Sequence, residues 1–168
     1  MAYSLTEGRI GWPSITTRTS TAPIPVGSRT KAYDSTYGEG EFIYLLGVSS
    51  TETGDMVAYD ATTYQTTRAG TTAAQGSPVA VAMGANLGGS YGWYQIGGNA
   101  VIKKVAVKVN PQVKVYVGGT TGRLTSVASA GKLIQNAKSS NLTTIASATS
   151  TVVVLIERPY LRGVTSAI

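Results

Sequence analysis

The sequence predicts an all-β fold, arranged as one antiparallel sandwich or barrel, and three observations support this prediction. Thr, Val and Tyr are abundant and 20 of the 168 residues are glycine, a composition that favours strands and tight turns over helices. Roughly eight to ten strand-like segments recur about every ten residues, as in sandwiches and barrels. No window has the apolar period of an amphipathic helix. We expect one domain of about 130 residues, preceded by an N-terminal arm.

Residues 1–38 are predicted to form this extended arm, and residues 39–168 the domain. The stretch 13–25 has no helical or sustained strand period, and its prolines and Ser/Thr runs favour an extended backbone. Its isolated apolar residues suit an arm that lies in a groove on another subunit. The alternative is a flexible terminus in which the apolar residues occur by chance and have no role. The apolar residues in question are Trp12, Ile15, Ile24 and Val26.

From residue 39 the pattern changes to short strands separated by turns. The Gly54-Asp55 pair turns the chain into the second strand, and Pro78 begins the third, where its missing N–H is tolerated. Residues 61–77 are predicted to be a loop, and the last strand is expected to end at Pro159. The predicted strands are 41–48, 56–60, 78–84, 90–98, 99–109, 112–117, 123–125, 132–134, 142–146 and 150–159.

The segment 99–109 has the alternation of a half-buried strand. Lys104 and Lys108 are expected on its solvent face, and Lys103 is an exception on the apolar face, at an edge or against a partner. The expected apolar face consists of Val101, Val105, Val107 and Val109.

Cysteine and histidine are both absent, which excludes disulfides, Cys-ligated metal sites and the Ser-His-Asp and Cys-His catalytic arrangements. Glu39 and Glu41 would share a strand face, but two isolated acids are a weak indication of a cation site or an acid pair. The glycine-rich stretch 118–122 lacks the Gly-Lys-Ser/Thr ending of a phosphate loop. We therefore expect no enzyme and no catalytic, cofactor-binding or metal-binding residues.

The formal net charge of +6 is unevenly distributed. Residues 1–102 carry five basic and seven acidic side chains, whereas residues 103–168 carry nine basic side chains and only Glu157 as an acid. This asymmetry suggests an acidic protein surface or nucleic acid as a partner, and the alternative is a solvated polar face. A nucleic-acid interface would combine a basic stripe with stacking by Tyr91, Tyr94 or Tyr116. The stripe would comprise Lys103, Lys104, Lys108, Lys114, Arg123, Lys132 and Lys138.

We nevertheless expect no nucleic-acid partner, because lysines that alternate with core valines are typical of solvent-facing strand positions. No stretch reaches the roughly 18–20 apolar residues needed to span a bilayer. The N-terminal residues lack the hydrophobic run of a secretory signal, so no membrane partner is expected.

A series of short motifs resembles the head decoration (cement) proteins of tailed bacteriophages. The stretch Ser90-Tyr91-Gly92-Trp93-Tyr94-Gln95-Ile96-Gly97-Gly98 resembles their Tyr-Gly-Trp-x-Gln strand, with Tyr94 where an aliphatic residue is more usual. A Val-Tyr step, a Gly-x-Leu-Thr turn and a final apolar strand ending in Arg-Pro-aromatic follow in the same order. The matching segments are Val115-Tyr116, Gly122-Arg123-Leu124-Thr125 and Leu155-Ile156-Glu157-Arg158-Pro159-Tyr160. The upstream Gly54-Asp55-Met56-Val57 hairpin also fits, so the resemblance covers residues 38–162 but not the Thr-rich arm.

The resemblance implies a β-tulip-like barrel or a jelly roll, and a structural protein on the outside of an icosahedral capsid. Such proteins are made in the cytoplasm of the bacterial host and are not enzymes. They form homo-oligomers, with a trimer favoured and a dimer possible, which bind the major capsid protein and cement it against internal DNA pressure. The absence of cysteine suits assembly in a reducing cytoplasm.

Two sets of site residues follow from this hypothesis. The arm is expected to contact the capsid through Trp12, Ile15, Arg18, Ile24 and Pro25, so deletion of residues 1–30 should leave a folded oligomer that no longer binds capsids. The residues Tyr91, Trp93 and Gln95 are expected either in a subunit interface or in the core.

Two other classes of function are alternatives to this hypothesis, and an enzyme is the less expected of the two. A carbohydrate- or receptor-binding module of a virion would display aromatic residues in one exposed cleft, and buried Trp12 and Trp93 would count against it. An enzyme would have to use Glu39 and Glu41.

Overall fold

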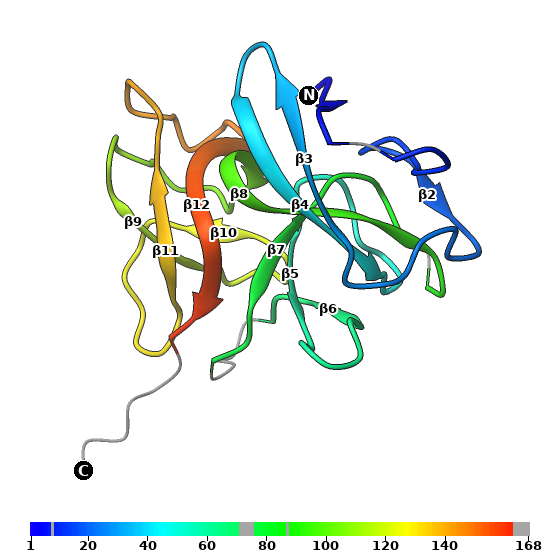
Figure 1. Cartoon of the computed structure of the whole chain (residues 1–168). Coiled ribbons are helices and arrows are strands. Elements are labelled where there is room, and N and C mark those ends of the chain that lie inside the picture. Colours follow the sequence, from blue (N-terminus) through cyan, green and yellow to red (C-terminus); the bar gives the residue numbers. More distant parts are fainter. Residues whose placement is uncertain (8, 71–75, 87, 163–168) are drawn as a thin grey trace.

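The structure, a computed structural model, describes residues 1–7, 9–70, 76–86 and 88–162. Its described part is all-β, and every ladder between its strands is antiparallel, which confirms the predicted fold class (Figure 1). The strands are β1 (Ser4–Leu5), β2 (Arg18–Thr19), β3 (Arg29–Asp34), β4 (Gly38–Leu46), β5 (Met56–Tyr59), β6 (Thr66–Arg68), β7 (Val79–Ala82), β8 (Tyr91–Lys103), β9 (Lys114–Val117), β10 (Leu124–Thr125), β11 (Leu133–Ser139) and β12 (Thr151–Leu161). The main path of the sheet runs β1-β3-β4-β8-β12-β11-β9-β10.

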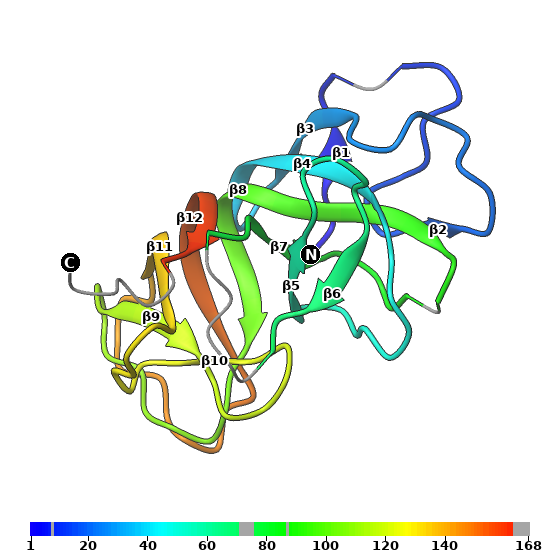
Figure 2. The same ribbon diagram turned by 90° about the horizontal axis from the view of Figure 1, so that it is seen from below.

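The long strand β8 joins the two halves of the molecule (Figure 2). Residues 91–97 of β8 pair with β4, and residues 97–103 pair with β12. At the changeover Gly98 has a φ of +87°, and a Cβ on it would collide with the carbonyl oxygen of Glu39. Only glycine tolerates both conditions. The prediction of separate strands over 90–98 and 99–109 was therefore wrong, because Gly97 and Gly98 allow one strand to continue through the bend.

The predicted alternation was wrong for residues 100–104, although Val109 is buried and Lys108 is exposed as expected. Ala100, Ile102 and Lys104 are buried, whereas the Val101 side chain is half-exposed. The strand ends at Lys103, so the alternation of the later valines belongs to a non-strand segment and does not set the phase of β8. As a result the ammonium group of Lys104 lies inside the domain.

The front half of β8 and its neighbour β4 are buried on both faces. Phe42, Tyr44 and Trp93 face a cluster completed by Ile15 and Ile24 from the N-terminal segment. On the opposite face, alternate residues of the same two strands pack against Val57, Ala80 and Ala82 of β5 and β7; these alternate residues are Ile43, Leu45, Tyr94 and Ile96. A third cluster fills the half built by β9 to β12.

The N-terminal segment is thus a cover for its own sheet. Ile15 and Ile24 are only 1% and 6% exposed, and β2 pairs with the start of β8. The Trp93 indole donates a hydrogen bond to the carbonyl of Pro13 at 3.0 Å. β3, which lies inside the predicted arm, pairs with β4 over its whole length. Isolated apolar residues on an extended polar segment have the same sequence pattern whether they pack on their own sheet or on another subunit. The pattern therefore predicted an arm that binds another subunit, whereas the residues pack on their own chain.

Asp34 fixes the start of this cover. Its carboxylate accepts hydrogen bonds from the backbone amides of Ala2 at 2.6 Å, Thr36 at 2.8 Å and Tyr37 at 3.1 Å. Burial raises the pKa of Asp34, but the bonds from Thr36, Ala2 and Tyr37 together outweigh burial and hold the pKa below its ordinary value of 3.8.

A pH dependence follows from this lowered pKa. A carboxyl group with a lower pKa in the folded state stabilises the fold above about pH 4, and this contribution is lost as the pH falls through the folded-state pKa. We expect urea unfolding to show a steeper acid loss of stability in the wild-type protein than in Asp34→Asn, whose amide oxygen does not titrate. Equal slopes for the two proteins would contradict this role of Asp34.

Three further boundaries differ from the predictions. The predicted loop 61–77 contains β6, and the predicted strand 142–146 contributes only one isolated bridge, between Val109 and Ile145. β12 continues past Pro159 to Leu161. It does so because the proline lies where the β11–β12 register is interrupted, and there a missing N–H costs little.

Candidate interaction surface

Six carboxylates of the described residues accept hydrogen bonds or pair with cations, namely Asp34, Glu39, Glu41, Glu52, Asp55 and Asp60. Glu39 pairs with Lys31 at 3.3 Å, and Glu41 accepts two bonds from Arg158 at 3.0 and 3.3 Å. The two glutamates are therefore held by separate cations and do not form an acid pair. The described residues contain no group of three or more side chains suited to hold a metal ion.

The predicted basic stripe is broken at its start. Lys103 pairs with Glu52, an interaction that lowers the pKa of Glu52. The Lys104 side chain is buried and its ammonium donates to the carbonyl oxygens of Val107 at 2.8 Å and Ser147 at 3.2 Å. Burial lowers the pKa of Lys104. Neither lysine is free to contact a phosphate backbone.

The aromatic residues of the Tyr-Gly-Trp motif lie in or against the core. Trp93 and Gln95 are 1% and 0% exposed, and Tyr91 is half-buried over Tyr44. Gln95 donates to the backbone carbonyls of Gly97 at 3.0 Å and Asn99 at 3.1 Å, so it holds the bend in β8. Of the two alternatives, the core position is the one that the structure has for Trp93 and Gln95.

Trp12 is half-buried and its ring lies 5.5 Å from that of Trp93. Tyr94 is fully buried. Trp93 and Tyr94 are therefore occupied by packing inside the chain, whereas Tyr91 and Tyr116 are only partly buried.

Of the residues predicted to contact the capsid, the structure buries some in the core and leaves others exposed. Ile15 and Ile24 belong to the chain's own core, which corrects their assignment as capsid contacts. Arg18 and Pro25 are exposed, and Trp12 is partly covered.

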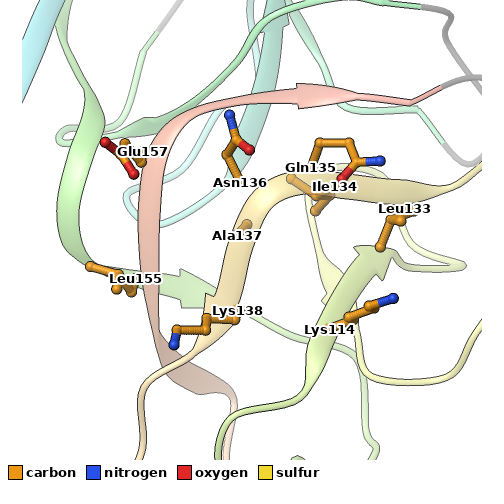
Figure 3. A pocket seen from close by; sticks show the side chains of 9 residues that line it. All are labelled: Lys114, Leu133, Ile134, Gln135, Asn136, Ala137, Lys138, Leu155 and Glu157. Carbon is orange, nitrogen blue, oxygen red and sulfur yellow. The ribbon is translucent and has the colours of Figure 1, made fainter.

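A concave surface lies on the other half of the molecule, over β9, β11 and β12 (Figure 3). It holds a hollow of about 320 Å³ with polar and apolar side chains. Lys114 and Lys138 come from neighbouring strands at one end, and Glu157 lies away from both. The lining residues are Lys114, Leu133, Ile134, Gln135, Asn136, Ala137, Lys138, Leu155 and Glu157.

The sheet register explains this arrangement. Lys114 of β9 lies directly opposite Lys138 of β11, and Lys138 lies opposite Leu155 of β12. Successive side chains of a strand point to opposite faces, so Val154 and Ile156 are buried while Leu155 is 40% exposed. One outer row of the sheet therefore carries two cations beside an exposed leucine.

A second hollow of about 300 Å³ adjoins the first across β12, and Leu155 and Glu157 line both. Gly97 and Gly98 are among its lining residues. Arg158 and Asn136, one lining each hollow, have φ values of 45° and 57°, a left-handed conformation that non-glycine residues seldom adopt.

The sequence named both lysines but not the leucine. Lys114 and Lys138 belonged to the predicted basic stripe, and only the register shows that they face each other. Leu155 follows from strict alternation within 150–159, since it is flanked by valine and isoleucine that must point inward. Because residues 152–156 are all apolar, the sequence alone does not indicate which of them faces outward.

The facing lysines lead to a stability prediction. Like charges directly opposite on a sheet destabilise it, and an opposite-charge pair contributes roughly 0.2–1 kcal/mol. Lys114→Glu should therefore raise the free energy of unfolding by about that amount at low salt, and high salt should remove the gain. Urea titrations of this variant and of Lys108→Glu, an exposed control, would measure it. A variant no more stable than the wild-type protein at low salt would contradict the predicted repulsion.

Comparison of the chain with protein-family models, curated proteins and solved structures gives no match. Within the described residues, no helix is long and apolar enough to cross a membrane.

Proposed function

We propose that this protein is a capsid decoration protein, which binds the outer surface of a phage head and cements neighbouring major capsid protein subunits. The observation that carries the proposal is the exposed concave face of β9, β11 and β12, which presents two lysines without a carboxylate within 4.0 Å among the described residues. Two exposed lysines on neighbouring strands, without an acidic partner within 4.0 Å among the described residues, suit an acidic protein partner.

The motif resemblance supports the same proposal. Its segments occupy framework positions: the Tyr-Gly-Trp stretch lies in β8, the Val-Tyr and Gly-x-Leu-Thr steps lie in paired strands β9 and β10, and the Arg-Pro-aromatic ending lies in β12. We propose a homo-oligomer, with a trimer favoured and a dimer possible, because the decoration proteins that the motifs resemble form such oligomers. One oligomer that bridges several capsid subunits needs only modest individual contacts. The exposed Arg18 and Pro25 remain proposed capsid contacts of the N-terminal segment.

The buried aromatic residues count against the alternative, a carbohydrate- or receptor-binding module. Trp93 and Tyr94 would have to leave the core to reach a ligand, and we therefore do not favour that function.

Co-sedimentation tests the proposal. Purified protein is mixed with expanded phage heads that lack it, and the pelleted protein is measured against concentration. Saturation at a fixed ratio to the major capsid protein is the expected result, and the ratio reports trimeric or dimeric sites. Protein that stays in the supernatant at every salt concentration would overturn the proposal.

Point substitutions in the N-terminal segment are a better test of capsid contact than the deletion of residues 1–30. Removal of residues 1–30 would uncover Phe42, Tyr44 and Trp93 and would delete the start of β3. The exposed pair is therefore tested by Arg18→Ala and Pro25→Ala, which leave the cover in place. A loss of head binding with unchanged unfolding would assign the contact to these residues.

A further inference from the structure

We propose that the hollow over β9, β11 and β12 is the docking site for an extended acidic–apolar segment of a protein partner. Under the proposed function, on which this inference rests, that partner is the major capsid protein. The segment would place one carboxylate at Lys114, another at Lys138, and an apolar side chain on Leu155.

The charge arrangement points to the carboxylate. Lys114 and Lys138 are exposed and directly opposed in the register, an arrangement that disfavours the isolated sheet. No acidic side chain of the described residues lies within 4.0 Å of either ammonium. Figure 3 shows the two ammonium groups pointing to opposite sides of the row, so each is open to a carboxylate of the partner segment, and each such contact would be a charge-assisted hydrogen bond.

The neighbouring residues point to the apolar part of the segment. Leu155 is 40% exposed in the same row, next to Lys138, and the half-buried Leu133 and Ala137 line the same hollow. Covering this apolar surface is favourable in proportion to the area removed from water. Since the two features lie side by side, one extended segment can satisfy both.

The backbone makes the hollow a formed site rather than one that must be created on binding. Asn136 at the edge of the hollow has a φ of 57°, and the β11–β12 register shifts beside it. A site held in shape by the sheet loses less entropy when a partner binds.

Charge reversal separates binding from stability. In Lys114→Glu/Lys138→Glu the two facing charges remain alike, so the repulsion within the sheet is preserved while complementarity to an acidic segment is inverted. Lys108→Glu/Lys132→Glu makes the same change in net charge outside the hollow. Leu155→Ser tests the apolar part.

Two probes are used with the full chain. On expanded heads that lack the protein, we expect the double reversal in the hollow to weaken binding at least about tenfold, Leu155→Ser about threefold, and the control less than about twofold. In ¹⁵N NMR titrations, a synthetic peptide of alternating Glu and Leu should shift the amides of β11 and β12 around the hollow, and a Gln–Leu peptide should not.

The outcomes distinguish the two proposals. If the wild-type protein does not bind heads but the Glu–Leu peptide shifts the hollow, the decoration function fails and the docking site stands. If heads bind the reversed variant as well as the wild-type protein and the peptide leaves the hollow unshifted, the docking site is overturned and the decoration function stands. Stronger shifts of the same amides by single-stranded DNA than by the peptide would also overturn it, in favour of nucleic acid.

Discussion

Replacement of Trp93 by alanine should destabilise the protein by about 3–5 kcal/mol, the range for a large aromatic residue removed from a packed core. Trp93 is 1% exposed, its ring meets Tyr44 at 5.2 Å and Trp12 at 5.5 Å, and its indole N–H bonds to Pro13. The substitution therefore removes packing inside the sheet and also the hydrogen bond to the N-terminal cover. Since whole domains have stabilities of about 5–15 kcal/mol, the loss is a large fraction of the total.

Urea unfolding measures the loss, and limited trypsin digestion reports the cover. We expect cleavage after the exposed Arg9 and Arg18 to become faster in Trp93→Ala than in the wild-type protein, because the N-terminal segment has lost its contacts with the Trp93 ring and indole N–H. Trp93→Phe keeps a ring in the cluster and should cost less. Tyr33→Ala is the control, since Tyr33 is 53% exposed on β3. Equal midpoints for Trp93→Ala and Tyr33→Ala would show that the cover contributes little.

Replacement of Asp55 by alanine should cost about 3 kcal/mol, the low end of the range for a broken buried ion pair, because Arg68 keeps access to water. Asp55 is fully buried and accepts bonds from the Arg68 guanidinium at 2.9 Å and the Glu52 amide at 3.0 Å. Arg68 also donates to the carbonyl of Thr121 at 3.2 Å. The Asp55 carboxylate thus ties the turn before β5 to β6, and Arg68 extends the connection to the loop before β10.

A second substitution distinguishes the lost charge from lost packing. Arg68→Met in the Asp55→Ala background removes the unpaired guanidinium, and we expect it to recover part of the stability. Glu7→Gln, at an exposed position, should leave the unfolding midpoint unchanged. If Asp55→Ala unfolds like Glu7→Gln, the ion pair does not hold these segments together. If Arg68→Met recovers nothing, packing rather than charge accounts for the loss.

The residues involved in these two predictions illustrate how far sequence reasoning extends. The Gly54-Asp55 pair predicts a turn before a short strand, and the structure confirms both the turn and β5. Nothing in the linear pattern showed that Asp55 would meet an arginine from a segment predicted to be a loop. The bond depends on β6 pairing with β5, and three polar residues such as Thr66–Arg68 carry no detectable strand period.

The candidate surface shows the same division. The sequence shows the clustering of cations in residues 103–168, but it does not show which contacts each lysine makes in the folded chain. Lys103 pairs with Glu52, Lys104 is enclosed by carbonyl groups, and only Lys114 and Lys138 meet across a ladder. These differences follow from strand ends and register, which are decided by contacts between segments far apart in the chain.

The sequence by itself determined the class of fold, since a chain rich in Thr, Val, Tyr and Gly without helical periodicity can bury its apolar residues only as short strands. It also determined which chemistry is absent, because side chains such as cysteine and histidine that do not occur cannot act. The tertiary structure alone decided that the N-terminal segment covers its own sheet, because an extended polar segment with isolated apolar residues fits its own chain or another equally well. The choice depends on the exposed aromatic face that β4 and β8 present once they pair, and that face exists only in the folded chain.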